Sequence, residues 1–315
     1  MYRPKVLVVG AGMVGATAAY EIARLDVCDC VDLLDIREGI AVGKAMDIMQ
    51  ARQLLGFSTL VRGFTGDYQA CGGNDIVVIT SGAPRKPGMT REELIHTNAA
   101  IVKEVVEKVL ENSNEPIFIV VSNPVDSITY MLTQMLPEYP KNKIIGMGGA
   151  LDSARFGYYI SQAFGHRDYC DGLVLGGHGD ATMVPVVESA TRMGQREYFD
   201  PETMKQVVEE TKVGGARITQ LLGTSAWVAA GVVIAAMVNA IIQDLRIYMP
   251  CSVYRDEYGL CIGTNCMLGE HGIEGYEINL NYTSENPAIY DALERITIVN
   301  NEVDKFLSNG TTQPK

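Results

Sequence analysis

A histidine, an aspartate and an arginine in two short motifs have the side chains needed to move a proton and hold a carboxylate. LDSARF (151–156) places Asp152 and Arg155 three residues apart, so that on a helix both project from one face. The planar guanidinium of Arg155 suits a bidentate bond to a carboxylate, and Asp152 can orient a histidine. His178 in GGHGD (176–180) is the candidate acid/base group, because no apolar periodicity explains it. A surface ion pair and a structural histidine are the simpler alternatives.

A second candidate site is the loop GAPRKPGMTR (82–91), which gathers cations in a chain of formal net charge −12. Its cations are Arg85, Lys86 and Arg91. The loop follows a predicted strand (75–79) and lies at the sheet edge where open α/β sheets bind ligands. Such a loop can close over an anion and exclude water. A solvated surface turn is the alternative.

The motif VVGAGMVG (8–15) predicts a dinucleotide site. Gly10, Gly12 and Gly15 follow one predicted strand and open a predicted helix, whose N-terminal N–H groups can bind a pyrophosphate. Asp35 ends the next strand, 20 residues after Gly15. A carboxylate there accepts hydrogen bonds from a ribose diol and repels a 2′-phosphate. We therefore predict NAD rather than NADP.

The elements that position these groups change in character near residue 148. Residues 1–148 alternate apolar runs with helical patterns, which predicts a doubly wound, parallel Rossmann sheet of the α/β class. The expected strands are 5–9, 31–35, 75–79, 117–121 and 143–147, and the expected helices are 13–25, 38–55 and 91–111. Residues 149–315 predict an α+β substrate domain. Its expected helices are 150–164, 201–222, 226–243 and 285–308, and its expected strands are 170–176, 246–254, 260–267 and 275–280.

The composition limits the function further. The chain has 315 residues with 38 acidic and 26 basic side chains, so nucleic-acid binding is not expected and an anionic substrate needs local cations. Seven cysteines without C-x-x-C spacing predict free thiols in a reducing compartment and no metal site. With no signal-peptide pattern, and with its longest apolar run (226–242) short for a membrane span, we expect a cytoplasmic protein without membrane contact. That run suits a core or subunit-interface helix.

Taken together, six ordered motifs resemble the lactate/malate dehydrogenase family, and most closely its lactate-dehydrogenase-like malate dehydrogenases. The motifs are GAGMVG (10–15), DIREG (35–39), TSGAPRKPGMTREEL (80–94), SNPVD (122–126), LDSARF (151–156) and GGHGD (176–180). The resemblance spans essentially the whole chain. It implies NAD-dependent, reversible oxidation of (S)-malate to oxaloacetate by a homo-oligomer, a tetramer in preference to a dimer.

Carried over by position, the resemblance also implies the roles of single residues. His178 takes the hydroxyl proton while hydride leaves C2, and Asp152 holds the imidazole. Arg155 binds the C1 carboxylate, Arg91 polarises the C2 oxygen, and Asn123 hydrogen-bonds that oxygen. Ser225 is implied to line the substrate pocket, and the implied cofactor contacts are Gly10, Gly12, Met13, Val14, Gly15, Asp35, Thr80, Gly82, Asn98, Val121 and Asn123.

Arg85 matches the position that sets substrate specificity in this family. There an arginine meets the C4 carboxylate of malate or oxaloacetate, whereas lactate dehydrogenases carry glutamine. If the loop closed on pyruvate, the guanidinium would be buried without a partner, and such a mismatch can reject an analogue by about 10⁴-fold. Lys86 adjoins Arg85, so a register one residue off would place lysine at this position.

Three alternatives to a malate dehydrogenase stay open. A lactate dehydrogenase of the same family would have lost Arg85 or lengthened the 82–91 loop. An NAD- and metal-dependent glycosidase of similar fold would need a longer chain and a Cys/His metal site. A non-catalytic NAD-binding protein would lack His178, Asp152 or Arg155, all of which are present.

Overall fold

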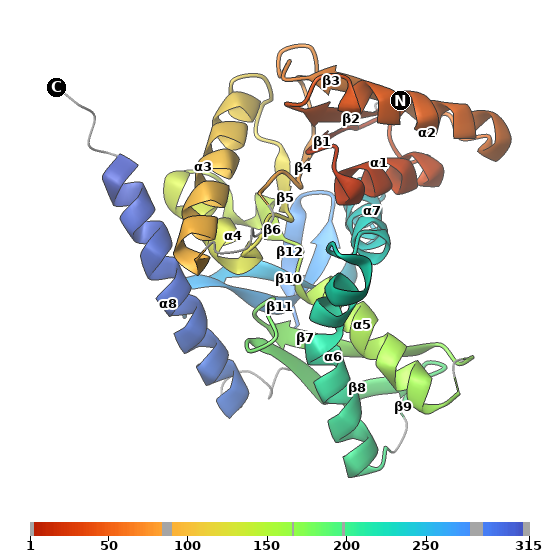
Figure 1. Ribbon diagram of the computed structural model, residues 1–315, viewed down its shortest axis with the longest axis vertical. Coiled ribbons are helices and arrows are strands. Elements are labelled where there is room, and N and C mark those ends of the chain that lie inside the picture. Colours follow the sequence, from red (N-terminus) through yellow and green to blue (C-terminus); the bar gives the residue numbers. More distant parts are fainter. Residues whose placement is uncertain (1–2, 84–89, 166, 197–198, 278–285, 311–315) are drawn as a thin grey trace.

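The computed structural model describes residues 3–83, 90–165, 167–196, 199–277 and 286–310, with the side chain of Arg91 excepted. The first half of the chain alternates strands and helices as predicted (Figure 1). Its elements are β1 (Lys5–Val9), α1 (Met13–Leu25), β2 (Cys30–Asp35), α2 (Ile40–Leu55), β3 (Leu60–Thr65), β4 (Ile76–Ile79), α3 (Arg91–Leu110), β5 (Ile117–Val120), α4 (Val125–Met135), the 3₁₀ turn η1 (Lys141–Lys143) and β6 (Ile144–Gly146).

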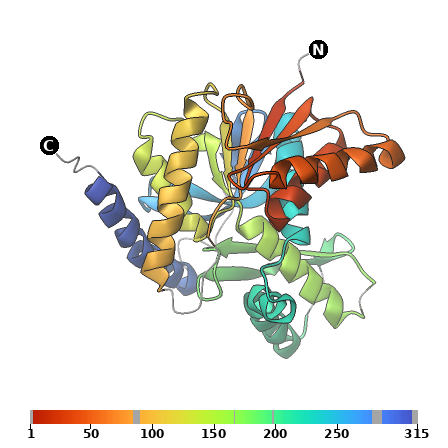
Figure 2. The same cartoon turned by 45° about the horizontal axis from the view of Figure 1, so that its top comes forward.

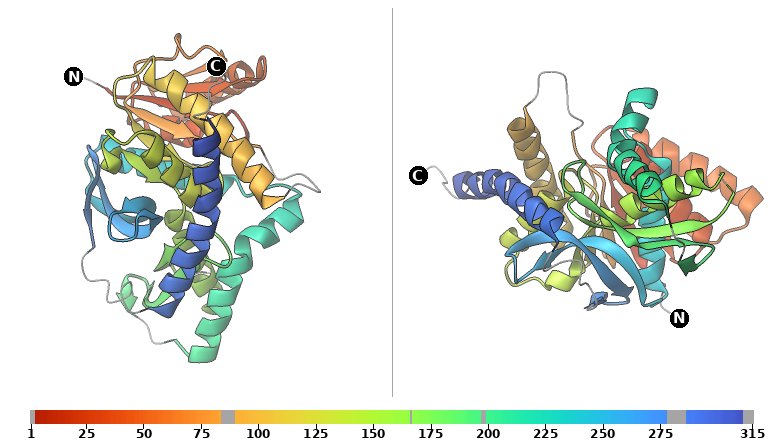
Figure 3. Two further views of the ribbon diagram at one scale, coloured as in Figure 1. Left: turned by 90° about the vertical axis from the view of Figure 1, so that its left-hand side faces the viewer. Right: turned by 90° about the horizontal axis from the view of Figure 1, so that it is seen from below.

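The second half mixes helices with antiparallel strands. Its elements are α5 (Gly149–Ala163), β7 (Cys170–Gly176), β8 (Met183–Arg192), β9 (Gln195–Arg196), α6 (Pro201–Leu222), α7 (Val228–Ile242), β10 (Ile247–Arg255), β11 (Leu260–Gly269), β12 (Gly272–Tyr276) and α8 (Pro287–Gly310). The long helix α8 runs past α3 and α4 to the strands of this half, so it lies against both parts of the chain (Figure 3).

Within the described ranges the strands form one mixed sheet of 12 strands in the order β3-β2-β1-β4-β5-β6-β10-β11-β7-β8-β9, with β12 beside β11. β1 to β6 are parallel to their neighbours, as the predicted Rossmann arrangement requires. The antiparallel strands of the second half join them where Ser252 of β10 pairs with Gly146 of β6. The predicted division at residues 148 and 149 falls just after this junction, and it stays a prediction.

Alternation along the parallel strands sorts the core into two layers. Val6 and Val8 of β1 pack with α1, α2 and α7, whereas Leu7 and Val9 pack with α3, α4 and α8. Figure 2 shows α1 and α2 on one face of these strands and α3 on the other. Because both faces are covered, the strands read as unbroken apolar runs in the sequence.

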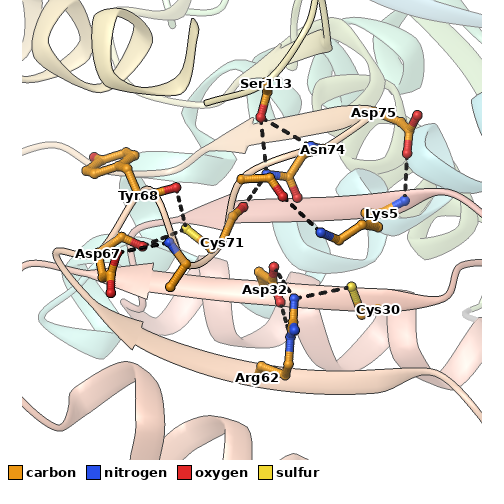
Figure 4. Close-up of polar contacts among 12 residues, drawn as sticks. Lys5, Cys30, Asp32, Arg62, Asp67, Tyr68, Cys71, Asn74, Asp75 and Ser113 are labelled. Carbon is orange, nitrogen blue, oxygen red and sulfur yellow. Dashed lines mark hydrogen bonds and ion pairs between the residues drawn. The ribbon is translucent and has the colours of Figure 1, made fainter. Parts of the chain in front are cut away.

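A buried ion pair shows how the first half tolerates a charged group among its apolar runs. Asp32 of β2 is fully buried and pairs with Arg62, directly opposite on β3 (Figure 4). Arg62 donates from Nε to Oδ1 at 2.8 Å and from Nη2 to Oδ2 at 2.7 Å, so the buried charge is matched.

All seven cysteines lie in the described ranges and are buried and unpaired, as their spacing predicts.

The predicted apolar helix becomes α7, which packs against α1. A Cβ on Gly231 would lie 2.6 Å from the Cγ2 of Thr17, so the small residue allows the two helices to approach closely. The helix is mainly part of the core, although Val228 and Val232 on it are exposed. In the described part of the chain, every helix is too short or too polar to cross a membrane.

Candidate active site

The connection between β1 and α1 forms an open cradle. Gly10 has a φ of +103°, and a Cβ there would lie 2.8 Å from the backbone nitrogen of Ser81. At Gly15 a Cβ would lie 1.9 Å from the carbonyl oxygen of Gly10, so the loop packs tightly on the first turn of α1. Gly12 caps α1 without a side-chain hydrogen bond and has open space around its Cβ position. The helix N-terminus can therefore receive a pyrophosphate.

Asp35 lies beside this cradle at the end of β2. Its Oδ2 accepts the N–H of Ala11 at 2.8 Å, and its Oδ1 accepts the N–H of Arg37 at 2.9 Å. Burial alone would raise the pKa of Asp35, but the hydrogen bonds and charge of Arg37 and the Ala11 N–H hold that pKa below its ordinary value. The carboxylate is therefore ionised at neutral pH, as ribose binding and rejection of a 2′-phosphate require.

Asn98 of α3 ties together the loops that follow the central strands. Its Oδ1 accepts the N–H of Ala83 at 2.7 Å, and its Nδ2 donates to the carbonyl oxygen of Asn123 at 2.7 Å. Thr80 donates from Oγ1 to the carbonyl oxygen of Gly10 at 2.9 Å. The carboxyl ends of β1, β4 and β5 thus meet at one edge. The other residues predicted to contact the cofactor lie at the same edge: Met13 and Val14 in the first turn of α1, Gly82 beside Asn98, and Val121 directly after β5.

A second set of contacts joins His178 to α5. The Nδ1 of His178 lies 2.7 Å from Oδ2 of Asp152, and Arg155 donates from Nη1 to Oδ1 of the same carboxylate at 2.9 Å. Asp152 is fully buried, and the side chains of His178 and Arg155 are only 16% and 15% exposed. The structure thus brings together the three residues that the LDSARF and GGHGD motifs single out.

The surroundings of His178 tune its proton affinity. Burial alone would lower the pKa of the imidazole, but the charge and hydrogen bond of Asp152 and the charge of Asp126 outweigh burial and the repulsion of Arg155. The net effect raises the pKa above its ordinary value. A histidine tuned in this way can hold a proton near neutral pH and give it up to a reacting oxygen.

Arg155 is fitted closely between α5 and α6. A Cβ on Gly215 of α6 would lie 3.2 Å from Nη1 of Arg155, so glycine leaves room for the guanidinium. A pocket of about 820 Å³ opens beside it, lined among others by Leu151, Arg155, Tyr158, Glu210 and Arg217. His178 does not line this pocket. The candidate site is therefore defined by the contacts among His178, Asp152 and Arg155 rather than by the cavity.

Two of the residues predicted on the cationic loop, Arg85 and Lys86, lie outside the described residues. Arg91 begins α3, and the helix start is fixed by Thr90 and Glu93, which form a reciprocal capping box. Ser225 lies exposed in the connection between α6 and α7.

Asp126 was missed as a site residue by the sequence reasoning. It is buried, and its Oδ2 accepts the backbone N–H of His178 at 2.7 Å. The signal was present, because the SNPVD motif that supplies Asn123 ends on Asp126. Within the described residues no group of three or more His, Cys, Asp or Glu side chains is arranged to hold a metal ion.

Both parts of the chain match domains of one known protein family. Residues 4–146 match the model of the lactate/malate dehydrogenase NAD-binding domain, and residues 149–297 match the model of the alpha/beta C-terminal domain of the same family. This chain belongs to the lactate/malate dehydrogenase family. The family's first domain binds NAD, and the uncapped start of α1, the open space at Gly12 and the ionised Asp35 all fit that cofactor.

Relatives within the family include malate dehydrogenases. The chain is 52% identical over 285 residues to the malate dehydrogenase of Bacteroides thetaiotaomicron, covering 88% of this chain and 91% of that protein. It is 51% identical over 293 residues to the malate dehydrogenase of Parabacteroides distasonis, covering 91% of this chain and 93% of that protein.

Solved structures of the family share the fold. The malate dehydrogenase of Picrophilus torridus superposes with a TM-score of 0.91 at 32% identity, covering 98% of this chain and 100% of that one. A lactate dehydrogenase of Cryptosporidium parvum gives a TM-score of 0.87 at 30% identity, covering 96% of this chain and 99% of that one. Because both activities occur on this fold, the substrate must be argued from side chains.

Proposed function

We propose that this chain is an NAD-dependent malate dehydrogenase that interconverts (S)-malate and oxaloacetate. The observation that carries the proposal is the buried Asp152, whose two oxygens join His178, a proton carrier, to Arg155, a carboxylate binder. Malate in particular is supported by the relatives at 52% and 51% identity, which are malate dehydrogenases.

In the proposed mechanism His178 carries the proton at Nε2, because Nδ1 is held by Asp152. NAD, when bound, supplies the hydride acceptor. During malate oxidation Nε2 takes the proton of the C2 hydroxyl, and the imidazolium that forms is stabilised by the carboxylate of Asp152. In the reverse direction the same nitrogen donates to the C2 oxygen of oxaloacetate.

The remaining roles concern substrate binding. Arg155 binds the C1 carboxylate, Arg91 and Asn123 bind the C2 oxygen, and Arg85 binds the C4 carboxylate. The net charge of −12 supports this set, because a dianionic substrate is repelled unless the site supplies local cations. Ser225 completes the pocket in this proposal.

The proposed enzyme is a homo-oligomer, a tetramer in preference to a dimer. Apolar side chains on α2 and near the junction of α6 and α7 are exposed, and contact with another subunit would remove them from water. They are Met46, Leu54, Leu55, Leu221, Leu222 and Val228. A cytoplasmic location stays a prediction of the sequence.

The proposal is tested by the substrate preference of the purified enzyme. Loss of NADH absorbance with oxaloacetate or pyruvate gives kcat/KM for each, and we expect oxaloacetate to be preferred by about 10³-fold or more. A preference for pyruvate would make the chain a lactate dehydrogenase. NADH binding without turnover of either acid would favour a non-catalytic protein.

The cofactor assignment is tested by Asp35→Ser. We expect the ratio of kcat/KM for NADPH to that for NADH to rise by about 10- to 100-fold, because the change removes the negative charge and frees Arg37 to meet a 2′-phosphate. The matched control is Asp29→Ser, since Asp29 is exposed just before β2. A ratio that is equal in both variants and the wild type would show that Asp35 does not select the cofactor.

A further inference from the structure

His178 is held by a second buried carboxylate, on its backbone side. Asp126, in the first turn of α4, accepts the His178 N–H at Oδ2 over 2.7 Å. Its Oδ1 accepts the hydroxyl of Ser252 on β10 over 2.6 Å. Asp126 is 7% exposed and Ser252 is 1% exposed, so both hydrogen bonds are shielded from water.

These bonds join three segments that are distant in sequence. Asp126 lies three residues after Asn123, His178 lies in the turn after β7, and Ser252 is the residue through which β10 pairs with Gly146 of β6. An uncharged acceptor such as an asparagine oxygen would serve to join them. A buried carboxylate is costly to desolvate, so mechanical support alone does not explain why a charged group occupies this position.

The charges around His178 indicate what the carboxylate adds. Among the described residues, the charged groups that act on the imidazole are Asp152 and Arg155 from α5 and Asp126 from α4. Asp152, which also forms an ion pair with Arg155 at 2.9 Å, acts most strongly on the proton of His178 through its charge and its hydrogen bond. Asp126 adds a second negative charge, whose effect exceeds the opposing effect of Arg155. The Cys261 thiol on β11 also acts on this region, but burial raises its pKa well above the ordinary value and keeps it neutral.

We propose that Asp126 is a second positioning carboxylate for His178, which fixes its backbone and adds to the negative charge of Asp152 that favours the protonated imidazole. The proposal rests on the proposed acid/base role of His178. Burial raises the pKa of Asp126, while the Ser252 hydroxyl and the His178 N–H counteract part of that rise by stabilising the ionised form. Asp126 thereby increases the fraction of enzyme with a protonated histidine, the form from which oxaloacetate reduction begins.

The test is Asp126→Asn, which keeps an oxygen for the His178 N–H but removes the charge. Two readouts are compared: the titration of the His178 ring by NMR in the enzyme without substrate, and the pH profiles of kcat/KM in both directions. Removal of the charge lowers the pKa of His178, so both profiles move to lower pH. On the alkaline side oxaloacetate reduction falls by about tenfold, and on the acid side malate oxidation is retained. A purely structural role would lower both rates at every pH without moving the profiles.

The matched control is Asp32→Asn, which neutralises a buried aspartate whose partner, Arg62, does not contact the site. It should leave the titration of His178 unchanged. Ser252→Ala provides a second variant if Asp126→Asn does not fold. Loss of the hydroxyl raises the pKa of Asp126, so the His178 titration moves in the same direction as in Asp126→Asn, but by less.

The outcomes separate this proposal from the proposed function. An unchanged His178 titration in Asp126→Asn and Ser252→Ala, with normal malate dehydrogenase turnover, overturns the role of Asp126 and leaves the proposed function intact. A shifted titration in an enzyme that turns over neither oxaloacetate nor pyruvate supports the action of Asp126 on His178 and overturns the proposed function.

Discussion

His178→Asn is expected to lower kcat/KM for oxaloacetate reduction by about 10³-fold, within the range that a positioned acid/base group contributes. Asparagine can occupy similar space and hydrogen-bond to Asp152, but it carries no proton that titrates near neutral pH. The glycine cradle between β1 and α1 and Asp35 at the end of β2 are separate from His178, so NADH should bind with its wild-type affinity. Steady-state kinetics measure the first effect, and quenching of protein or cofactor fluorescence measures the second.

The control for this variant is His271→Asn. His271 lies between β11 and β12, and its side chain is 72% exposed, so the same chemical change is made at a solvent-exposed histidine. Its kcat/KM should match that of the wild type. If His178→Asn retained near-wild-type activity while His271→Asn lost it, the proton carrier would have been assigned to the wrong histidine.

Much of the fold was predictable where local signals mark both ends of an element. α6 was predicted residue for residue, because Asp200 caps its N-terminus, Pro201 occupies its first turn and Gly223, with a φ of +69°, ends it. The parallel strands other than β3 were predicted within one residue at each end, since burial on both faces makes each an apolar run. β12 lies at Gly272–Tyr276 rather than at the predicted 275–280, of which residues 278–280 fall outside the described residues.

Elements without such signals were not predicted. β3 is an edge strand that carries Arg62, a residue explained only by the buried Asp32 on the neighbouring strand. β8 contains Pro185 and polar side chains that interrupt any apolar run. α4 is an 11-residue helix that is buried on nearly every side, including its polar residues Asp126, Thr129 and Thr133, so its polar pattern does not mark a solvent-exposed face.

The candidate site also contains residues that the sequence pattern predicts and one that it does not. Asp152 and Arg155 were found because helical spacing places them on one face, and His178 because its glycine-rich setting lacks a packing explanation. The contact of Asp126 with His178 could not be read from spacing. It is made to a backbone N–H that is 52 residues away, and only the pairing of distant strands and loops brings the two together.

Arg85→Gln is expected to change the substrate of the enzyme. A dicarboxylate brings a second negative charge into a protein of net charge −12, and without Arg85 that charge lacks its partner. We expect kcat/KM for oxaloacetate to fall by about 10³- to 10⁴-fold and kcat/KM for pyruvate to rise, because a buried guanidinium no longer opposes the methyl group. NADH oxidation with each acid measures both effects in one preparation.

Lys86→Gln is the matched control, because it removes a cation from the adjacent position of the same loop. If the loop selects through geometry, Lys86→Gln lowers the rate with both acids slightly and leaves their ratio unchanged. If it selects through its total charge, the two variants shift the ratio equally, since each removes one positive charge. A ratio that moves only in Lys86→Gln would place lysine at the selecting position. Because a lysine is a point charge without the fork of a guanidinium, discrimination would then rest on charge rather than on bidentate geometry.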